Sequence, residues 1–259
     1  MPRRRVAIRA ATAVVGLLVV AGCANFPFPP PTAPPSSSPG SAPPSESPSP
    51  PPAADAITID SPQDGTRVQV PVEVSGMANT FEAALTVDLL TEAGDILCMR
   101  HIMATSGSGT PGTWQTRLGF APQGDTEAPV TLRAYELSAN DGSITNLVER
   151  PLTLSPEHPP IMLTSPICGD VVAAGGALAV QGLATVFEAA LTIELRDAAG
   201  ATVLSRNLMT AEGGVESLFG EFVTVPAGLA PGFYDLVAFN YNPEDGSIEN
   251  EFPVQIAVR

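Results

Sequence analysis

The sequence predicts an all-β protein in which two tandem immunoglobulin-like antiparallel β-sandwiches follow an export signal and a proline-rich linker. Three observations predict this class. A segment of about 100 residues occurs twice between residues 56 and 259. Each copy alternates apolar and polar residues with a period of two, which is typical of strands that bury one face. Turn-forming residues divide each copy into about seven short strands, the number found in an immunoglobulin-like sandwich.

Residues 1–22 have the organisation of a lipoprotein signal peptide. Arginines at positions 3, 4, 5 and 9 precede about a dozen apolar residues, which suits export but is too short to span a bilayer. The residues Val20-Ala21-Gly22-Cys23 resemble the bacterial lipobox, in which cleavage precedes a cysteine that carries acyl chains. The resemblance implies lipidation at Cys23 and a stable anchor on the outer face of the cell membrane. An ordinary signal peptide or an uncleaved anchor is the alternative interpretation.

Residues 23–55 form the expected linker. Between Pro27 and Pro52, 13 of 26 residues are proline, and serine, alanine and threonine supply most of the others. Such a segment has no apolar periodicity with which to build a core, and its prolines favour extended polyproline II. Fully extended, it would reach on the order of 100 Å, so we expect it to hold the following domains well away from the membrane.

The two sandwiches are predicted at residues 56–157 and 158–259. Three short motifs of the first copy recur in the second at a spacing of 104 to 106 residues. They are Ser61-Pro62-x-x-Gly65 and Ser165-Pro166-x-x-Gly169, the identical hexapeptides Phe81–Thr86 and Phe187–Thr192, and Asp141-Gly142-Ser143-Ile144 with Asp245-Gly246-Ser247-Ile248. A repeat of this length is the size of a domain, which indicates a duplicated domain and not a solenoid.

Strand-like runs follow one another within the first copy. They lie near residues 57–60, 68–75, 96–103, 113–120, 130–137 and 146–154, with one further strand beginning at Phe81. In that strand, we expect the core to receive Phe81, Ala83, Leu85, Val87 and Leu89, and the alternate residues to face water. Neither copy has the Cys-Trp-Cys pattern of a true immunoglobulin domain, so the likeness to that fold is architectural. Trp114 lies in a strand pattern and is expected in the core.

The order of these motifs resembles the Gmad2 domain. Each copy has an opening Ser-Pro-x-x-Gly, a Gly-x-Ala-x-x-Phe-Glu-Ala segment, an Ala-Gly turn and a late Asp-Gly-Ser-Ile turn. The resemblance covers residues 57–154 and 161–258. It implies an immunoglobulin-like module of bacterial surface and spore-germination-associated lipoproteins, with a binding or interaction role and no catalytic residues.

Two elements of the family pattern carry acidic side chains. Glu82 and Glu188 follow Phe81 and Phe187 directly, and a functional interpretation makes them binding carboxylates. We favour a structural interpretation, in which they accept hydrogen bonds from the late turns. Those turns consist of Asp141, Gly142 and Ser143 in the first copy and Asp245, Gly246 and Ser247 in the second. A calcium site built from Asn140, Asp141, Glu244 and Asp245 is the weaker alternative, because the spacing of an EF-hand is absent.

Two cysteines remain after Cys23 is set aside. Leftover thiols outside the cytoplasm tend to pair, and a bond between Cys98 and Cys168 would fix the angle between the sandwiches. The alternative of two free, buried thiols would leave a loose hinge at residues 155–160. The repeat alignment places Cys98 opposite Leu204 and Cys168 opposite Asp64.

Composition excludes several classes of function. The chain contains 12 arginines, no lysine and 27 acidic residues, and removal of the signal leaves a net charge of −19. Such a surface is unsuited to nucleic acid or to anionic lipid. The absence of lysine excludes a Schiff base and a Walker phosphate loop. The only two histidines, His101 and His158, offer no catalytic spacing, so we expect no enzyme, no cofactor and no metal.

Two functions of different classes remain. The first is a lipid-anchored, non-enzymatic surface protein whose modules bind an envelope component, a protein partner or another copy. The second is a lipoprotein that captures a carbohydrate, a small molecule or calcium. The single tryptophan and three tyrosines supply few stacking platforms for a carbohydrate, so we favour the first.

Overall fold

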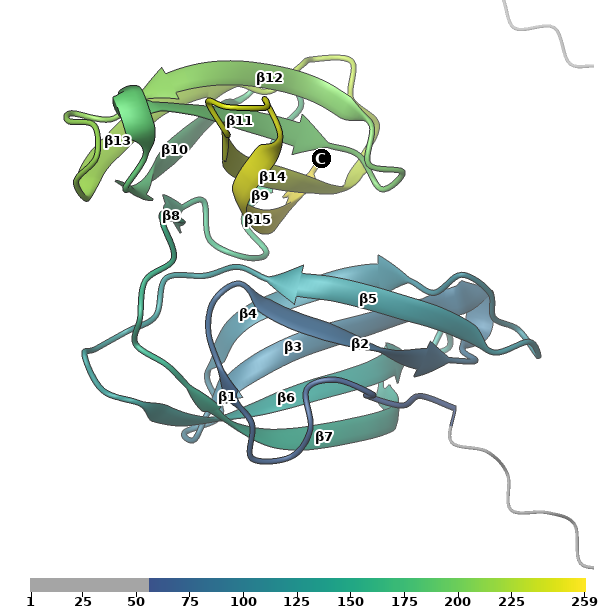
Figure 1. Ribbon diagram of the computed structural model, residues 1–259. Helices are drawn as coiled ribbons and strands as arrows, with labels where there is room; N and C mark the ends of the chain where they lie inside the picture. Colours follow the sequence, from purple (N-terminus) through teal and green to yellow (C-terminus); the bar gives the residue numbers. More distant parts are fainter. Residues whose placement is uncertain (1–55) are drawn as a thin grey trace, which may run out of the picture. The chain divides into compact units, whose positions relative to one another are not determined.

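The computed structural model describes residues 56–259 (Figure 1). The predicted signal peptide, the lipidation at Cys23 and the linker lie outside these residues. The predicted all-β class is confirmed, because residues 56–259 form 15 strands and two short 3-10 turns, η1 and η2. No helix of the described residues is long and apolar enough to cross a membrane. All these residues belong to one compact unit.

The first seven strands build domain 1. They are β1 (Arg67–Val68), β2 (Val72–Ala78), β3 (Ala84–Thr91), β4 (Ile96–Met103), β5 (Gly112–Leu118), β6 (Ala128–Leu137) and β7 (Ile144–Leu154). One sheet has the order β1-β7-β6-β3-β4, and β2 pairs with β5 in the other. All pairs are antiparallel except β1 with β7. Residues 57 and 61 add isolated bridges to β2, where the sequence predicted a strand.

The remaining eight strands build domain 2 with the same plan. They are β8 (Ile161–Ser165), β9 (Val171–Val172), β10 (Ala177–Ala184), β11 (Ala190–Arg196), β12 (Thr202–Met209), β13 (Ser217–Thr224), β14 (Gly232–Tyr241) and β15 (Ile248–Val258). The sheets have the orders β12-β11-β14-β15-β9 and β13-β10-β8. In both domains the strand pairs therefore follow the repeat, with β3 and β4 corresponding to β11 and β12.

The inner faces of the sheets form the core, as the period of two predicts. Leu85, Val87 and Leu89 of β3 are buried, and the corresponding residues of β11 are buried as well. Trp114 of β5 is also buried, which confirms its predicted place in the core. The apolar residues on alternate positions thus supply the surface that each sandwich removes from water.

The predicted start of the central strand is wrong in both copies. Phe81 and Phe187 are 60% and 66% exposed and do not enter the core. Phe81–Ala83 forms η1 and Phe187–Ala189 forms η2, so the extended backbone begins only at Ala84 and at the corresponding Ala190. The alternation of a strand cannot be extended backward through a tight turn, because the turn does not keep the two-residue period of the side chains; Phe81 is therefore exposed, although Ala83 is still buried.

The outer face of β3 also differs from the prediction. Asp88 was expected to meet water, yet its side chain is fully buried. Arg133 of β6 donates two hydrogen bonds to its carboxylate, at 2.8 and 2.6 Å, and Tyr135 donates a third at 3.0 Å. Burial, followed by the charge and hydrogen bond of Asp88, raises the pKa of Tyr135 to about 12. Periodicity assigns faces but does not show which polar residues meet a buried partner.

Candidate functional site

The Phe-Glu-Ala segment forms a strained turn in both domains. Glu82 and Ala83 have φ angles of 53° and 61°, and Glu188 and Ala189 have φ angles of 56° and 58°. Residues other than glycine rarely adopt this left-handed region, and the conformation costs roughly 1–3 kcal/mol at each. The same costly geometry therefore occurs twice, at the best-preserved motif of the repeat.

A glycine-rich loop holds the first turn in place. The Glu82 N–H donates to Ser108 Oγ at 2.9 Å, and the Ser108 N–H donates to the Thr80 carbonyl at 2.8 Å. A Cβ atom on Gly107 would lie 2.5 Å from the Ala83 nitrogen, so only glycine allows this approach. Gly213 has the same role in domain 2, where its Cβ would lie 2.7 Å from the corresponding nitrogen.

The turn is also hydrogen-bonded to the hairpin that joins the end of β6 to the start of β7. The Phe81 N–H donates to Glu136 Oε1 at 2.7 Å, and Asn146 donates its side-chain amide to Glu136 Oε2 at 2.9 Å. In domain 2, Asn250 donates to Asn240 Oδ1 at 2.8 Å at the corresponding positions. In domain 1 these bonds join the turn to the late hairpin, whereas the bond in domain 2 joins the two strands of the hairpin to each other.

Large apolar side chains are exposed at this end of both domains. In each domain they come from η1 or η2, from the end of β4 or β12, and from the hairpin of the last two strands. We call each set a tip patch: Phe81, Met103, Leu137 and Ile144 in domain 1, and Phe187, Met209, Tyr241 and Ile248 in domain 2. Their exposed fractions lie between 44% and 66%. Single exposed apolar residues are ordinary, but a matched set in two repeats indicates an interaction surface.

The late turns are satisfied within themselves. Asp141 Oδ1 accepts hydrogen bonds from the Ser143 N–H at 3.1 Å and from Ser143 Oγ at 2.8 Å. These bonds, the side-chain one first, lower the pKa of Asp141. Asp245 accepts from the Ser247 N–H at 2.9 Å, and Gly142 and Gly246 have φ angles of 72° and 73°. Each aspartate therefore stabilises the backbone conformation of the turn in which it lies.

The predicted hydrogen bonds from these turns to Glu82 and Glu188 are wrong. The Asp141 and Asp245 carboxylates take the donors of their own turns, and Glu82 contributes its backbone N–H to the glycine-rich loop. Glu136 is the carboxylate that binds the turn at Phe81. The sequence reasoning missed Glu136, because it lies more than fifty residues away and its counterpart in domain 2 is an asparagine.

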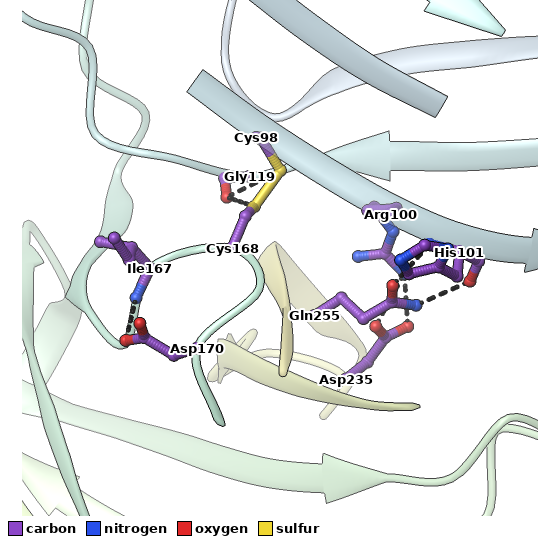
Figure 2. Close-up of a disulfide and its surroundings, with 9 residues drawn as sticks. All are labelled: Cys98, Arg100, His101, Gly119, Ile167, Cys168, Asp170, Asp235 and Gln255. Carbon is purple, nitrogen blue, oxygen red and sulfur yellow. Dashed lines mark hydrogen bonds and ion pairs between the residues drawn. A yellow bond between two sulfur atoms is a disulfide. The ribbon is translucent and has the colours of Figure 1, made fainter. Parts of the chain in front are cut away.

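A disulfide joins Cys98 of β4 to Cys168 in the loop between β8 and β9, with a sequence separation of 70 residues. Figure 2 shows this bond beside Gly119, whose carbonyl oxygen lies 3.2 Å from the Cys168 sulfur. Of the two alternatives left open by the sequence, the structure therefore has the paired form. The bond crosslinks the two domains directly.

Polar contacts surround the disulfide. Arg100 of β4 donates two hydrogen bonds of 2.7 Å to the carboxylate of Asp235 on β14, and the arginine side chain is only 7% exposed. The side-chain amide of Gln255 on β15 binds both the N–H and the carbonyl of His101, at 2.7 and 2.9 Å (Figure 2). The backbone N–H and carbonyl of His101, at the edge of the sheet, are thus hydrogen-bonded by domain 2 as a neighbouring strand would bond them.

The ring of His101 packs at the same contact. It stacks on Phe233 with ring centroids 4.3 Å apart, and its Nδ1 lies 3.1 Å from Thr86 Oγ1. Burial lowers the pKa of the imidazole. The stacking and the hydrogen bond give this half-buried histidine a packing role. His158 lies 3.6 Å from Glu216 at an exposed position.

A second ionic contact lies between β5 and β15. Arg117 donates to Glu251 Oε2 at 2.7 Å, and Arg196 donates to Oε1 of the same carboxylate at 2.8 Å. Burial acts to raise the pKa of Glu251, but the hydrogen bonds from Arg196 and Arg117 bring it below its usual value. Domain 1 therefore meets domain 2 through β4 and β5, while domain 2 offers the outer face of β14 and β15.

A cleft of about 1200 Å³ extends along this contact. Phe81, Met103 and Leu137 of the first tip patch line it, together with Asp235 and Phe233 of domain 2. Residues 56–259 contain no group of three or more histidine, cysteine, aspartate or glutamate side chains arranged to hold a metal. The cleft offers apolar surface and hydrogen-bonding groups to a binding partner.

The contact predicts a selective effect of one glycine. A Cβ atom on Gly119 would lie 2.1 Å from the backbone oxygen of Pro253, so Gly119→Ala should force the domains apart locally. We expect a loss of about 1–3 kcal/mol in the free energy of unfolding, as in overpacked cores. Denaturant titration is the measurement. Gly228→Ala is the control, since its Cβ would meet nothing within 4 Å; equal losses in both variants would contradict the prediction.

The comparisons with known proteins agree with this architecture. The model of the Gmad2 family, described as an immunoglobulin-like domain of bacterial spore germination, matches residues 56–143 and 160–247. The chain belongs to the Gmad2 family. Both Gmad2 matches contain the Phe-Glu-Ala turn and the Asp-Gly-Ser turn, so the two domains are tandem members of one family. The search of curated proteins found no match.

Several solved structures resemble the chain distantly. The fibronectin(III)-like modules of Clostridium thermocellum CbhA have 14% identity and a TM-score of 0.26, over 78% of this chain and 94% of that one. A putative membrane anchored protein from Corynebacterium diphtheriae has 12% identity and a TM-score of 0.28, over 79% of this chain and 59% of that one. At such scores these resemblances carry no argument, and the assignment to Gmad2 stands on the family match.

Proposed function

We propose that this protein is a non-enzymatic binding protein, anchored by lipid at Cys23 to the outer face of the bacterial cell membrane. Its two Gmad2 domains bind a protein of the envelope through the tip patches. The lipobox-like residues 20–23 support the anchor, and the proline-rich residues 27–52 support a spacer that extends from the membrane. The family description of germination offers spore-forming envelopes as one setting for this role.

The duplicated tip patch carries the proposal. Both domains keep a strained turn that exposes a phenylalanine, although burial would stabilise such a side chain by roughly 1.5–3 kcal/mol. A methionine and another large apolar residue lie exposed at matching positions beside each phenylalanine. Apolar anchors at the centre of a contact supply most of the binding energy in protein interfaces. A partner that meets both patches would also gain avidity.

The test is capture of partners by the full-length lipidated protein, extracted from its native membrane in mild detergent. Phe81→Ser with Phe187→Ser should abolish the captured protein partner, since both anchors are removed. The matched control is Ile96→Ser with Val171→Ser, which removes two apolar side chains that are 51% and 55% exposed and belong to neither tip patch. A partner retained equally by both double variants would contradict the proposal.

The cleft favours one second candidate function, the capture of a small ligand. Its volume of about 1200 Å³ and its mixed lining of apolar and ionic side chains would accommodate a glycan or a small molecule. Binding of a glycan panel to the same purified protein is the direct measurement. A clean glycan signal without any captured protein would favour this function over the first. A melting midpoint unchanged between calcium and chelator would exclude the calcium form.

A further inference from the structure

We propose that the protein associates head to tail with a second copy of itself. The contact would join β12 and β13 of domain 2 in one copy to the outer face of β6 and β7 of domain 1 in the next. This inference rests on the proposed binding and assembly function, and it names one partner. It uses none of the eight tip-patch side chains, so variants of the two surfaces can be made and measured separately.

The contact inside the chain provides the geometry. Domain 1 presents β4 and β5, with Arg100 and Arg117 as the side chains that reach across. Domain 2 receives them on the outer face of β14 and β15, at Asp235 and Glu251. The two partner surfaces are different, so this is a heterologous contact between two copies of one domain.

The strand pairings show which residues of domain 2 occupy the presenting positions. Val87 pairs with Arg100, and the corresponding Ile193 pairs with Arg206. Arg206 is therefore the counterpart of Arg100. In the same way, Glu73 pairs with Arg117, and Ala179, the counterpart of Glu73, pairs with Phe222. Phe222 is therefore the counterpart of Arg117.

The receiving positions of domain 1 follow from the same register. Ala134 pairs with Val148, and Ala238 pairs with Phe252. Leu147, the residue before Val148, is therefore the counterpart of Glu251. Leu90 of β3 pairs with Thr131 of β6, and its counterpart Arg196 pairs with Asp235. Thr131 is therefore the counterpart of Asp235.

Both of these surfaces are open in the described chain. β12 and β13 are the edge strands of their sheets. Phe222 and Leu218 of β13 are 75% and 71% exposed, the largest exposed fractions among the big apolar side chains. Leu147, on the receiving surface, is 44% exposed. An edge strand with large exposed apolar residues is a surface that normally requires a partner.

The residue pair at the centre of the contact inside the chain differs at both positions from its counterpart pair in the proposed contact between copies. Inside the chain, the ion pair Arg117–Glu251 connects the presenting and receiving surfaces at 2.7 Å. At the counterpart positions both charges are absent, and the pair is Phe222 with Leu147. A contact of the same geometry would therefore replace an ion pair with an apolar pair, and neither residue would face an unmatched charge. Arg206 would reach the Thr131 hydroxyl, with the exposed Glu149 nearby.

The contact should be weak and should strengthen with salt. No counterpart of the disulfide crosses it, because Leu204 and Asp64 stand at the cysteine positions. Copies that have lost the signal carry a net charge of −19 and repel one another, and added salt screens this repulsion. A heterologous contact that does not close on itself produces chains of copies. Anchoring to one membrane would raise the effective concentration and favour such chains.

The test uses the full-length lipidated protein in neutral phosphatidylcholine vesicles, with the photocrosslinker p-benzoylphenylalanine in place of Leu218. We expect a ladder of crosslinked copies that increases between about 0.05 and 0.5 M salt, a change that shortens the Debye length about threefold. Phe222→Arg alone and Leu147→Glu alone should each reduce crosslinking about tenfold, because each places a charge against an apolar side chain.

The combination of both changes in one chain supplies the decisive comparison. Each copy then carries an arginine and a glutamate that reproduce the Arg117–Glu251 pair, so crosslinking should recover to within about twofold of the unsubstituted chain. Misfolding cannot produce such recovery. A chain without crosslinked copies at either salt concentration, single variants that crosslink normally, or a double variant without recovery would each overturn the proposal. Loss of envelope partners in the tip-patch variants is measured separately.

Discussion

Replacement of both Cys98 and Cys168 with serine should lower the free energy of unfolding by about 4 kcal/mol. The disulfide closes a segment of 70 residues that includes the second half of domain 1 and the start of domain 2. Its loss returns conformational entropy to the unfolded chain. The measurement is denaturant titration of the purified protein, with unfolding monitored by the fluorescence of Trp114, the only tryptophan.

The same change should weaken the contact between the domains. The Arg100–Asp235 and His101–Gln255 bonds would then have to hold the surfaces together without a covalent link. Limited proteolysis at residues 155–160 should become faster in the double serine variant. Chemical reduction of the unsubstituted chain is the control and should reproduce both effects. A stability within about 1 kcal/mol of the oxidised chain would contradict the predicted entropic contribution.

The substitution Asp88→Asn should destabilise domain 1 by about 3–5 kcal/mol. The Asp88 carboxylate is completely buried and receives bonds from Arg133 and Tyr135. Asparagine keeps the volume but removes the charge, which leaves the largely buried guanidinium of Arg133 without its counterion. An unpaired buried charge is among the costliest defects that a single substitution can introduce.

Trp114 fluorescence during denaturant titration also measures this effect, because Trp114 lies in domain 1. Asp125→Asn is the matched control: it makes the same chemical change at an exposed position of the same domain and should alter stability by less than about 0.5 kcal/mol. If the two aspartates gave equal losses, burial of the Asp88 pair would not be the source of the cost. The pKa of Tyr135 should also fall in Asp88→Asn. Burial is the first cause of its rise and remains in the variant, but the contribution of the Asp88 charge is lost.

The fold could be predicted because its signals are local or repeated. The alternation at Leu85, Val87 and Leu89 reflects the pleat of a strand, and the same alternation recurs at Leu191, Ile193 and Leu195 of the second copy. The range predicted for residues 96–103 matches β4 at both ends. The prediction failed at Phe81 because two consecutive left-handed residues, neither of them glycine, leave no recognisable mark in the sequence.

The candidate sites were predicted less completely. The motif Phe-Glu-Ala indicated the right segment but assigned its phenylalanine to the core, whereas the side chain is exposed in both domains. Met103 and Leu137 join it only because β4 and β6 end beside the turn. Arg100 carried one available signal, because a charge between Cys98 and Ile102 on one face of a strand often marks a buried partner. Its partner Asp235 lies 135 residues away, beyond the reach of any local pattern.

The amino-acid sequence by itself determined the duplicated all-β architecture, the acidic and lysine-free composition, and the family to which both domains belong. These properties depend on residue type and on periodicity, which are present in the unfolded chain. Only the tertiary structure decided that Cys98 pairs with Cys168, that Asp88 is buried, and that Phe81 faces outward. Each of these depends on which distant strands become neighbours, because a contact requires proximity in space that strand alternation alone does not specify.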